Sequence, residues 1–442
     1  MIKTFKRGGV HPPENKISAQ VAIEVFNTQD TVRIFTSQHL GVPAEPVVTK
    51  GDTVKVGQLI AKSSGFISAN VHSSVSGTVT SIEAIADHMG FKKTAICIKI
   101  EGDEWEESID RSPDIIREIK HTPEEIIQKI TDAGVVGLGG ATFPTNVKLS
   151  IPPGKKAEAL IVNGAECEPY LTSDHRLMLE AGEQILIGME IIRQALKIDK
   201  TYIGIETNKM DAINHLKSFT QWIKHIEIVP LKPRYPQGGE KQLIKAVTGK
   251  EVPINGLPID TGYVVCNVGT VYSVYEAVQK NKPLIDNTVT ITGKKLKTQK
   301  NYLVRVGTPM SQLIESVGGI PEGTGKIVSG GPMMGKPIAN IDGPTLKGSS
   351  SILFMTEEES SRGDSSNCIR CAKCVGVCPM GLEPYLLLRL AERKMNDQLE
   401  ANFVHNCIEC GCCLYTCPAR LPLVDYIRLG KAEVLKIMRS RK

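Results

Sequence analysis

The sequence of 442 residues has no apolar run that approaches the ~20 residues of a membrane span. Its first residues, Met1 to Arg7, lack the apolar core of a signal peptide. These two absences predict a cytosolic chain, or one that is peripheral on the cytosolic side of a membrane. A net charge of +5 is too small to favour nucleic-acid binding. With 41% apolar and 23% charged residues, the composition is that of a soluble globular protein with roughly two to four domains.

Cysteine is plentiful, and most of it lies in two runs near the end of the chain. The runs read Cys368-x-x-Cys371-x-x-Cys374-x-x-x-Cys378-Pro379 and Cys407-x-x-Cys410-x-x-Cys413-x-x-x-Cys417-Pro418. This is the spacing of two-cluster bacterial ferredoxins, in which the fourth cysteine of each run binds the other cluster. We therefore predict two [4Fe–4S] clusters. One is held by Cys368, Cys371, Cys374 and Cys417, and the other by Cys407, Cys410, Cys413 and Cys378.

Two other uses of these cysteines are less favoured. Zinc sites also use Cys-x-x-Cys pairs, but zinc does not need the third and fourth cysteine of each run or the Cys-Pro endings. Structural disulfides are disfavoured because nothing marks the chain as secreted. Cys412 lies off the pattern and is predicted not to be a ligand. The scattered cysteines are expected to be small core residues; they are Cys97, Cys167 and Cys266.

The N-terminal third of the chain predicts an arm, an all-β domain and a linker. Residues 1–29, which include Gly-Gly-Val-His-Pro-Pro at 8–13, lack periodicity and are expected to be an extended arm. Residues 30–100 contain short β-rich runs punctuated by glycine, a pattern that resembles the biotinyl/lipoyl-type barrel-sandwich fold. Residues 70–74 read Asn-Val-His-Ser-Ser where a carrier domain has its modifiable lysine, so a structural or docking role is expected. The charged residues 101–121 are predicted to be a linker.

Residues 122–285 alternate between helical and strand patterns, which predicts a Rossmann-like α/β domain. Thr122, Pro123 and Glu125 form the sequence signature of a capping box, so a helix is expected from there to about Ala133. Further strands are predicted at 159–162, 202–205, 226–229 and 263–267, and further helices at about 176–196, 210–223 and 270–278.

The remaining residues predict two smaller parts. Residues 286–356 alternate as strands around one short helix and are expected to form a β-grasp module. Residues 357–442 form the ferredoxin segment, with helices at about 384–394 and 424–438. Its last 15 residues are basic, which favours a solvated helix end over a partner or membrane-surface contact. The predicted fold class is multidomain α/β and α+β.

A glycine loop and a pair of carboxylates are the candidate binding features of the α/β region. Gly137, Gly139 and Gly140 can free backbone N–H groups to form a nest for a phosphate, although glycine loops are often plain tight turns. No strand directly precedes this loop, unlike the dinucleotide fingerprint. Glu166 and Glu168 follow a predicted strand; they are exposed loop carboxylates or partners of ribose or flavin groups.

In combination, these segments resemble a known family. Residues 137–148, 163–169, 239–240 and 267–270 together are similar to the NADH-binding flavoprotein subunit of respiratory complex I. The glycine-containing arm, the lipoyl-like domain and the presence of two clusters match the C subunit of the Rnf ion-translocating electron-transport complex more closely. The resemblance covers nearly the whole chain.

This resemblance implies which residues bind the cofactor. It implies that FMN is cradled by Gly137, Gly139, Gly140 and Lys148. It places Asn163, Glu166 and Glu168 near the flavin and nucleotide, and Gly239, Glu240, Asn267 and Thr270 complete the pocket. The chain departs from the complex I pattern at Leu138, Thr142, Asn146, Ala165 and Lys241. The departures concern the nucleotide geometry more than the fold, because the phosphate cradle depends on backbone groups.

By the same resemblance, the chain is expected to be a peripheral redox subunit on the cytoplasmic face of the cell membrane. Electrons would pass between NADH, FMN and the two clusters, and on to membrane-embedded and iron–sulfur partner subunits and, through them, ferredoxin. A flavin is required because nicotinamide transfers electron pairs and iron–sulfur clusters transfer single electrons. No side-chain acid, base or nucleophile is needed, so no catalytic residue is predicted. Two alternatives remain: a flavin-dependent cobalamin reductase of the microcompartment type, and a flavin-free electron-wire or docking subunit.

Overall fold

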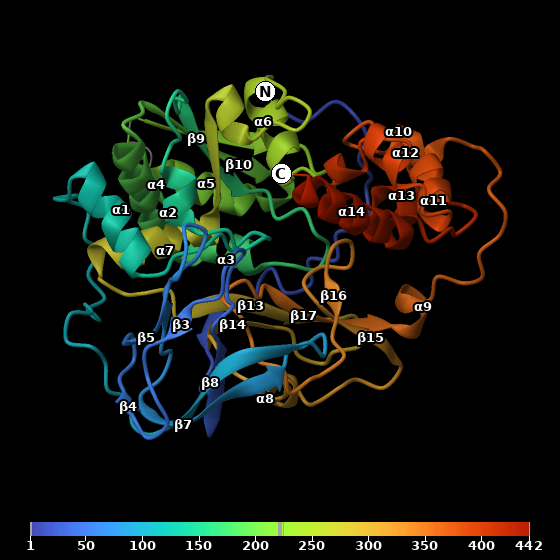
Figure 1. Cartoon of the computed structure of the whole chain (residues 1–442). Coiled ribbons are helices and arrows are strands. Elements are labelled where there is room, and N and C mark those ends of the chain that lie inside the picture. The colour runs from blue at the N-terminus through green and yellow to red at the C-terminus, as the bar shows by residue number, and fades with distance from the viewer. Residues whose placement is uncertain (1, 220–222, 224, 442) are drawn as a thin grey trace.

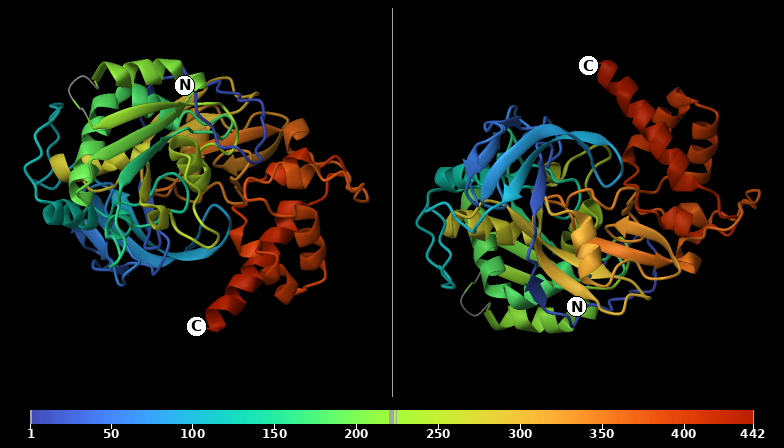
Figure 2. Two further views of the ribbon diagram at one scale, coloured as in Figure 1. Left: turned by 90° about the horizontal axis from the view of Figure 1, so that it is seen from above. Right: turned by 90° about the horizontal axis from the view of Figure 1, so that it is seen from below.

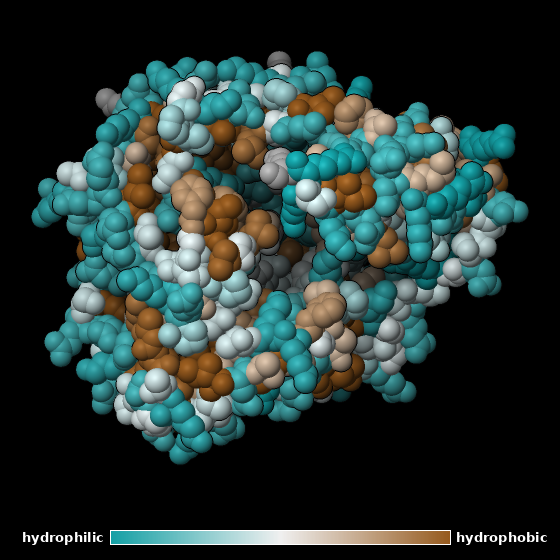
Figure 3. Space-filling model, in the orientation of Figure 1, coloured by the Kyte–Doolittle hydropathy of each residue, from teal (hydrophilic) through white to brown (hydrophobic). Residues whose placement is uncertain are grey.

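We describe the protein from a computed structural model, which covers residues 2–219, 223 and 225–441. An α/β body packs above two β-rich parts, and the helical ferredoxin segment lies to one side of all three (Figure 1). The face seen in Figure 3 is mainly hydrophilic, with apolar residues in separate groups, and it is hollowed near its centre, where these parts meet. Within the described residues, no helix has both the length and the apolar character to cross a membrane.

The first β-rich part is the predicted barrel sandwich. One sheet has the strand order β2–β8–β7–β4 and the other β3–β5–β6. The strands are β2 (Thr31–Phe35), β3 (Glu45–Pro46), β4 (Thr53–Val54), β5 (Leu59–Lys62), β6 (Val71–His72), β7 (Gly77–Ala86) and β8 (Lys92–Ile100). Val32 and Ile34 of β2 and Ile96 and Ile98 of β8 are fully buried, as period-2 alternation requires of one sheet face.

The segment at residues 70–74 lies inside the molecule and is not displayed as a carrier tip. Ser73 and Ser74 are fully buried. The Asn70 carbonyl accepts a hydrogen bond of 2.8 Å from Lys347 Nζ, which also donates to the Gly134 carbonyl at 2.7 Å. The buried lysine therefore joins the barrel sandwich to the α/β body.

The α/β body contains a four-stranded parallel sheet in the order β11–β10–β9–β12. Its strands are β9 (Ala159–Gly164), β10 (Lys200–Glu206), β11 (Ile226–Leu231) and β12 (Tyr263–Asn267). From β9 the chain extends the sheet to one side through β10 and β11, and β12 returns to the other side of β9. The topological switch point therefore lies between β9 and β12, where ligands of such sheets bind. Leu160 and Val162 face one core and Ile161 the opposite core, so helices cover both faces.

The helices of this body are α1 (Pro123–Asp132), α2 (Thr145–Leu149), α3 (Ser173–Glu180), α4 (Gly182–Leu196), α5 (Met210–Phe219), α6 (Glu240–Thr248) and α7 (Val268–Gln279). They agree with the sequence at α1, α5 and α7, whereas the short α2 was not predicted and one long predicted helix is broken. The single helix predicted at 176–196 is wrong, because Ala181 separates α3 from α4. A Cβ on Gly182 would lie 3.0 Å from His215 of α5, so the chain turns where the two helices pack closely. Of the predicted helix 210–223, residues 220–222 lie outside the described residues, and Ile223 is not helical.

The capping box at the start of α1 is present. The Glu125 N–H donates to Thr122 Oγ1 at 3.2 Å, and the Thr122 N–H donates to Glu125 Oε2 at 2.7 Å. Two orphan N–H groups of the helix are thus satisfied locally, which explains why the sequence alone identifies this boundary.

The β-grasp part is a six-stranded sheet in the order β1–β14–β13–β17–β15–β16, with α8 (Met310–Ser316) beside it. Its strands are β1 (Ile23–Val25), β13 (Asp286–Thr292), β14 (Lys300–Arg305), β15 (Thr324–Ser329), β16 (Lys336–Pro337) and β17 (Ser351–Thr356). The expectation that residues 1–29 form only an irregular arm is wrong at β1, which pairs in parallel with β14. This pairing depends on a strand far along the chain, so the local pattern does not reveal it.

The ferredoxin segment is a small helical part that follows α9 (Glu357–Ser360). It contains α10 (Lys373–Gly376), α11 (Pro384–Glu392), α12 (Asn396–Ala401), α13 (Cys412–Thr416) and α14 (Leu423–Ser440). Both predicted helices, α11 and α14, are present. Leu388 and Val434 are among its fully buried core residues. Figure 2 shows α14 and the C-terminus projecting from the body, in agreement with the expected solvated helix end.

Candidate functional site

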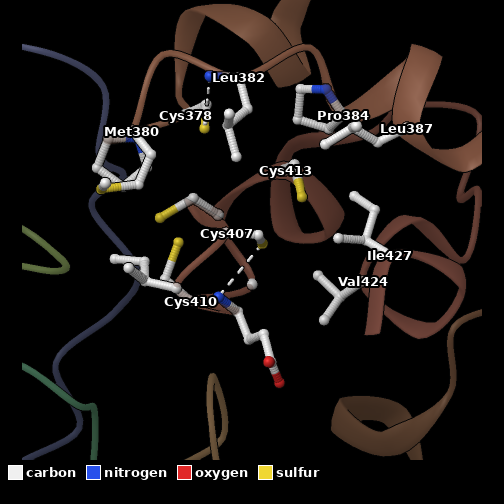
Figure 4. A pocket seen from close by; sticks show the side chains of 15 residues that line it. Cys378, Met380, Leu382, Pro384, Leu387, Cys407, Cys410, Cys413, Val424 and Ile427 are labelled. Carbon is white, nitrogen blue, oxygen red and sulfur yellow. Dashed lines mark hydrogen bonds between the residues drawn. The ribbon is translucent and has the colours of Figure 1, made fainter. Parts of the chain in front are cut away.

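Thiols from both cysteine runs line one pocket of the ferredoxin segment (Figure 4). Cys407, Cys410 and Cys413 come from the second run and Cys378 from the first, the same four that the crossed pattern assigns to one cluster. We call these four residues the inner site. The rest of its lining is largely apolar and includes Leu382, Leu387, Val424 and Ile427. Apolar burial raises the pKa of the Cys407 thiol to about 11, so binding of a cation there must displace a proton.

The other four cysteines form the outer site: Cys368, Cys371, Cys374 and Cys417. Burial and the nearby thiols of Cys417 and Cys371 raise the pKa of Cys374, so the structure brings the first run together with the last cysteine of the second. The two sites differ in exposure, because Cys371 is exposed whereas Cys378, Cys410 and Cys413 are buried.

The two cysteine loops repeat one backbone conformation. Arg370 and Ala372 follow Cys368 by two and four residues, and both have φ of +57°. At the equivalent places after Cys407, Glu409 has φ of +57° and Gly411 of +79°. Left-handed backbone is costly for residues other than glycine, and such strain gathers at ligand sites. In the second loop, the left-handed backbone at Glu409 lets its N–H donate to Cys407 Sγ at 3.4 Å. Backbone amides that donate to cysteine sulfur are typical of loops that bind iron–sulfur clusters.

The metal assignment of this pocket rests on the cysteine spacing. Five cysteines line the pocket, the four of the inner site and Cys412. A four-iron cluster takes one thiolate at each iron, and the spacing assigns these four to Cys378, Cys407, Cys410 and Cys413. Their role as cluster ligands remains a prediction.

Cys412 also lines the pocket of the inner site and packs against the α/β body. It is fully buried, and its Sγ lies 4.0 Å from the Tyr235 carbonyl oxygen of the α/β body. It remains a predicted non-ligand. Cys97 and Cys266 are buried as expected, whereas Cys167 is only partly buried.

The predicted FMN residues gather at the switch point of the parallel sheet. Asn163 lies at the end of β9 and Asn267 ends β12, and the two are direct partners in the strand register. The Asn163 side chain donates to the Gly238 carbonyl at 2.9 Å, which brings the loop before α6 to the same edge. The Asn267 side chain accepts from Gly269 N–H at 2.7 Å and caps α7.

The glycine loop closes over this edge. The Leu138 N–H donates to Thr270 Oγ1 at 2.9 Å, and a Cβ on Gly139 would lie 3.0 Å from Asn267. Gly140 has φ of +154°, and a Cβ there would meet no atom within 4 Å. In the described structure, the exposed N–H groups of Gly139 and Gly140 donate to no protein acceptor. Backbone amides without a protein acceptor, beside a switch point, are the donors that a phosphate requires.

Lys148 brings a positive charge to the same place. It follows the glycine loop on α2, and its Nζ donates to Glu240 Oε1 at 3.1 Å and to the Val265 carbonyl at 2.9 Å. Burial alone would lower the pKa of Lys148, but the negative charge of Glu240 outweighs it and raises the pKa. The lysine is therefore charged at neutral pH and sits between α2, α6 and β12. Gly239 precedes Glu240 as the N-cap of α6.

Glu166 and Glu168 behave differently from the other predicted residues. The Glu166 carboxylate accepts from the Asp174 N–H at 2.7 Å and the His175 N–H at 3.3 Å, at the start of α3. The Glu168 carboxylate accepts from the N–H groups of Met333 at 3.0 Å and Met334 at 2.8 Å. Both carboxylates thus bind backbone, and their contact with flavin or nucleotide remains a prediction.

Asp174 is a half-buried carboxyl at this site that the sequence analysis missed. The Asn267 Nδ2 donates to Asp174 Oδ2 at 2.7 Å, and burial together with the Glu166 charge raises the pKa of Asp174 to about 7. In the sequence it reads as an ordinary acidic residue in the first turn of a helix. Only the return of β12 beside β9 places it against Asn267.

The inner site is attached to the switch-point side of the α/β body. Tyr235, 2% exposed, donates from its hydroxyl to the Cys410 carbonyl at 2.8 Å. The N-terminal arm fills the space between them: Val10 pairs with Tyr235, and the Gly9 N–H donates to the Val377 carbonyl at 2.8 Å. The arm singled out in the sequence is therefore a strap that holds the ferredoxin segment to the α/β body.

Models of known families match four parts of the chain. They are the RnfC barrel sandwich hybrid domain at residues 3–104, the Nuo51 FMN-binding domain at 130–276, the SLBB domain at 288–337 and the 4Fe-4S dicluster domain at 360–418. These matches confirm the predicted fold class.

Curated relatives match over most of their length. The chain is 46% identical over 91% of its length, and 88% of the relative's, to the C subunit of the proton-translocating ferredoxin:NAD(+) oxidoreductase complex of Clostridium ljungdahlii. It is 43% identical over 98% of its length, and 97% of the relative's, to the C subunit of the Na(+)-translocating ferredoxin:NAD(+) oxidoreductase complex of Acetobacterium woodii. Among solved structures, an NAD+-reducing [NiFe]-hydrogenase in the H2-reduced state matches 71% of the chain and 63% of its own, at 19% identity and a TM-score of 0.49.

Proposed function

The chain belongs to the family of C subunits of ion-translocating ferredoxin:NAD(+) oxidoreductase complexes, the Rnf type that its sequence resembles, and from this membership we propose that it exchanges electrons between NAD(H) and ferredoxin-linked partners within such a complex. It is an oxidoreductase subunit with an FMN-binding domain and a dicluster domain. Of the three functions that the sequence left open, the relatives favour this one.

The joint between the two sites is the observation that carries the proposal. Tyr235 contacts the loop that contains Cys410. Gly238, three residues after Tyr235 in the loop before α6, contacts Asn163 at the switch point. When bound, FMN would exchange electron pairs with the nicotinamide and single electrons with iron–sulfur clusters. The protein's own contribution is to hold both sites in fixed, adjacent positions. For electron transfer this is sufficient, since no bond to a side chain has to form.

The residues divide the binding task by chemistry. The free amides of Gly139 and Gly140 and the ammonium of Lys148 would hold the FMN phosphate, a pairing of dianion with donors and positive charge. Asn163 and Asn267 would shape the pocket indirectly, because their side-chain amides hold the Gly238 loop, Asp174 and the start of α7 at the switch point.

We further propose that the chain is divided into four functional units, residues 30–100, 122–285, 286–356 and 357–442. The arm at 1–29 precedes the first unit, and the linker at 101–121 joins the first to the second.

The place of the chain in the complex follows from the family. The relatives are named as subunits of ion-translocating complexes, so membrane-embedded and iron–sulfur subunits are the proposed partners. We place the chain peripherally on the cytoplasmic face, where NADH is available.

Anaerobic purification of the full chain tests the proposal. It should yield FMN and about eight irons and eight sulfides per chain, and NADH should bleach both the flavin and the cluster absorbance. A chain that holds FMN and iron but shows no change with NADH would refute the enzyme function. A chain that carries zinc and no flavin would refute the cofactor assignment as well.

A further inference from the structure

The inner site faces the protein itself. Its loops contact the α/β body through Tyr235 and the N-terminal arm, and Gln242 Nε2 donates to the Pro379 carbonyl at 3.4 Å. The basic residues beside it are engaged, because Glu409 pairs with Arg428 at 2.9 Å and with Lys431 at 2.8 Å. These contacts cover the side of the inner site that faces the α/β body.

The outer site faces outward. Cys371 is exposed, residues 361–367 are all exposed, and Ile369 between two ligand positions is 67% exposed. Figure 1 shows the connection from α9 to α10, which carries Cys368, running around the outer side of the ferredoxin helices, and Figure 2 shows it at the edge of the molecule.

Several basic residues lie around the outer site. Its two ligand-bearing segments, 361–382 and 411–424, contain Arg362, Arg370, Lys373 and Arg420 against Asp364. The acids Glu383 and Asp425 follow these segments directly, and Asp425 is paired with Arg362. Arg370, Lys373 and Arg420 make no ion pair within the described structure, unlike the basic residues beside the inner site. A Cβ on Gly363 would meet the Arg420 guanidinium at 2.1 Å, which places Arg420 beside the exposed 361–367 connection.

Apolar groups accompany these charges. Tyr415, two residues before Cys417, is 51% exposed, and Tyr385 is 41% exposed with its backbone against Cys374. Exposed aromatic and aliphatic side chains surrounded by charge are typical of protein-binding surfaces. We call the outward surface of Ile369, Arg370, Lys373, Tyr415 and Arg420 the outer face.

We propose that the outer face docks an acidic one-electron carrier, a small iron–sulfur protein or domain, and that the outer site is the port through which this carrier exchanges electrons with the chain. One electron leaves the reduced carrier and is taken up at the outer site, or the reverse, with no bond made or broken. Complementary charge steers such an encounter and sets its orientation. The inference rests on the proposed function, since it supplies the partner side of the same electron path.

A charge reversal tests the docking surface. The anaerobically prepared full chain is compared with the variant R370E/K373E for binding to a small, acidic two-[4Fe–4S] ferredoxin, by equilibrium binding at several salt concentrations. We expect the reversal to weaken binding by at least about tenfold at low salt and to flatten the salt dependence. Stopped-flow mixing with the reduced ferredoxin should show cluster bleaching slowed by a similar factor.

The matched control is R393E/K394E at the far end of α11. It reverses two exposed charges in the same segment, and Lys394, like Arg370, has positive φ, at +52° against +57°. Binding of the control should stay within about twofold of the unmodified chain. Equal binding by R370E/K373E, or equal weakening by the control, overturns the proposal. If ferredoxin binds as expected while NADH fails to bleach the unmodified chain, the proposed function fails and the docking surface stands.

Discussion

Replacing Gly8 by alanine should loosen the ferredoxin segment from the α/β body. Gly8 has φ of +68°, and a Cβ there would lie 2.5 Å from the Cys378 carbonyl carbon and 2.6 Å from the Val377 oxygen. All of these are backbone atoms of the loop that supplies a thiol to the inner site. They cannot move aside like a flexible side chain, so the arm must leave the loop instead.

The magnitude follows from two contributions. An alanine in the left-handed backbone conformation destabilises the closed joint by about 1–2 kcal/mol, and the overpacking of its Cβ destabilises it by about 1–3 kcal/mol more. A substitution at Gly90, in the turn between β7 and β8, distinguishes the backbone contribution from the overpacking contribution. The φ of Gly90 is +89°, and a Cβ there would meet no atom within 4 Å. The variant G90A therefore carries the backbone cost alone. The overpacking contribution corresponds to roughly a 5- to 150-fold increase in opening of the joint.

Hydrogen exchange measures that opening. In G8A, the amides of Gly9 and Val10 should exchange roughly 5- to 150-fold faster, because their bonds to Val377 and Tyr235 break together. G90A should leave these amides unchanged. Cluster bleaching by NADH should slow in G8A while flavin bleaching does not. Protection of the arm in G8A equal to that in G90A would refute its role as a strap.

Three further predictions concern single side chains. Cys378→Ser should lower iron from about eight to about four per chain, whereas Cys412→Ser should keep all eight; iron loss in the second variant would make Cys412 a ligand. Lys148→Met should weaken FMN binding by roughly 10- to 100-fold, through loss of a charge-assisted bond, and the surface variant Lys155→Met should not; titration of the apoprotein with FMN measures both. Burial lowers the pKa of Lys347 from 10.5 to about 7, so the folded chain binds fewer protons than the unfolded chain between these values. Its unfolding free energy should therefore rise with pH across that window, by at most about 1.4 kcal/mol per unit, and Lys347→Met should lose this rise in denaturant titrations; an unchanged slope would contradict the assignment.

Local patterns identified much of this fold because they are short-range. The capping box at Thr122 is satisfied by a residue three positions away, and the alternation of β2 and β8 is written within each strand. Elements that depend on distant partners were missed or misjudged. The strand β1 exists only because β14 lies beside it, and the break at Ala181 follows from the packing of Gly182 against α5.

The candidate site divides in the same way. Cysteine spacing specifies ligand sets because a cluster imposes its geometry on a tight loop, and the repeated left-handed residues at Arg370 and Glu409 are the backbone form of that constraint. Nothing in the spacing says that Cys371 is exposed or that Cys410 touches Tyr235.

By itself, the sequence predicted the two sets of four thiols, the alternation that builds each sheet, and the glycine loop at 137–140. The alternation and the glycine loop depend on chemistry within one strand or one loop, and the two sets of thiols follow from a spacing that is repeated along the chain. Only the tertiary structure decided that β12 returns beside β9 to bring Asn163 and Asn267 together, that the arm straps the inner site to the α/β body, and that the outer site faces solvent. Each of these is a contact between segments far apart in the chain, and its energy depends on packing that no single segment contains.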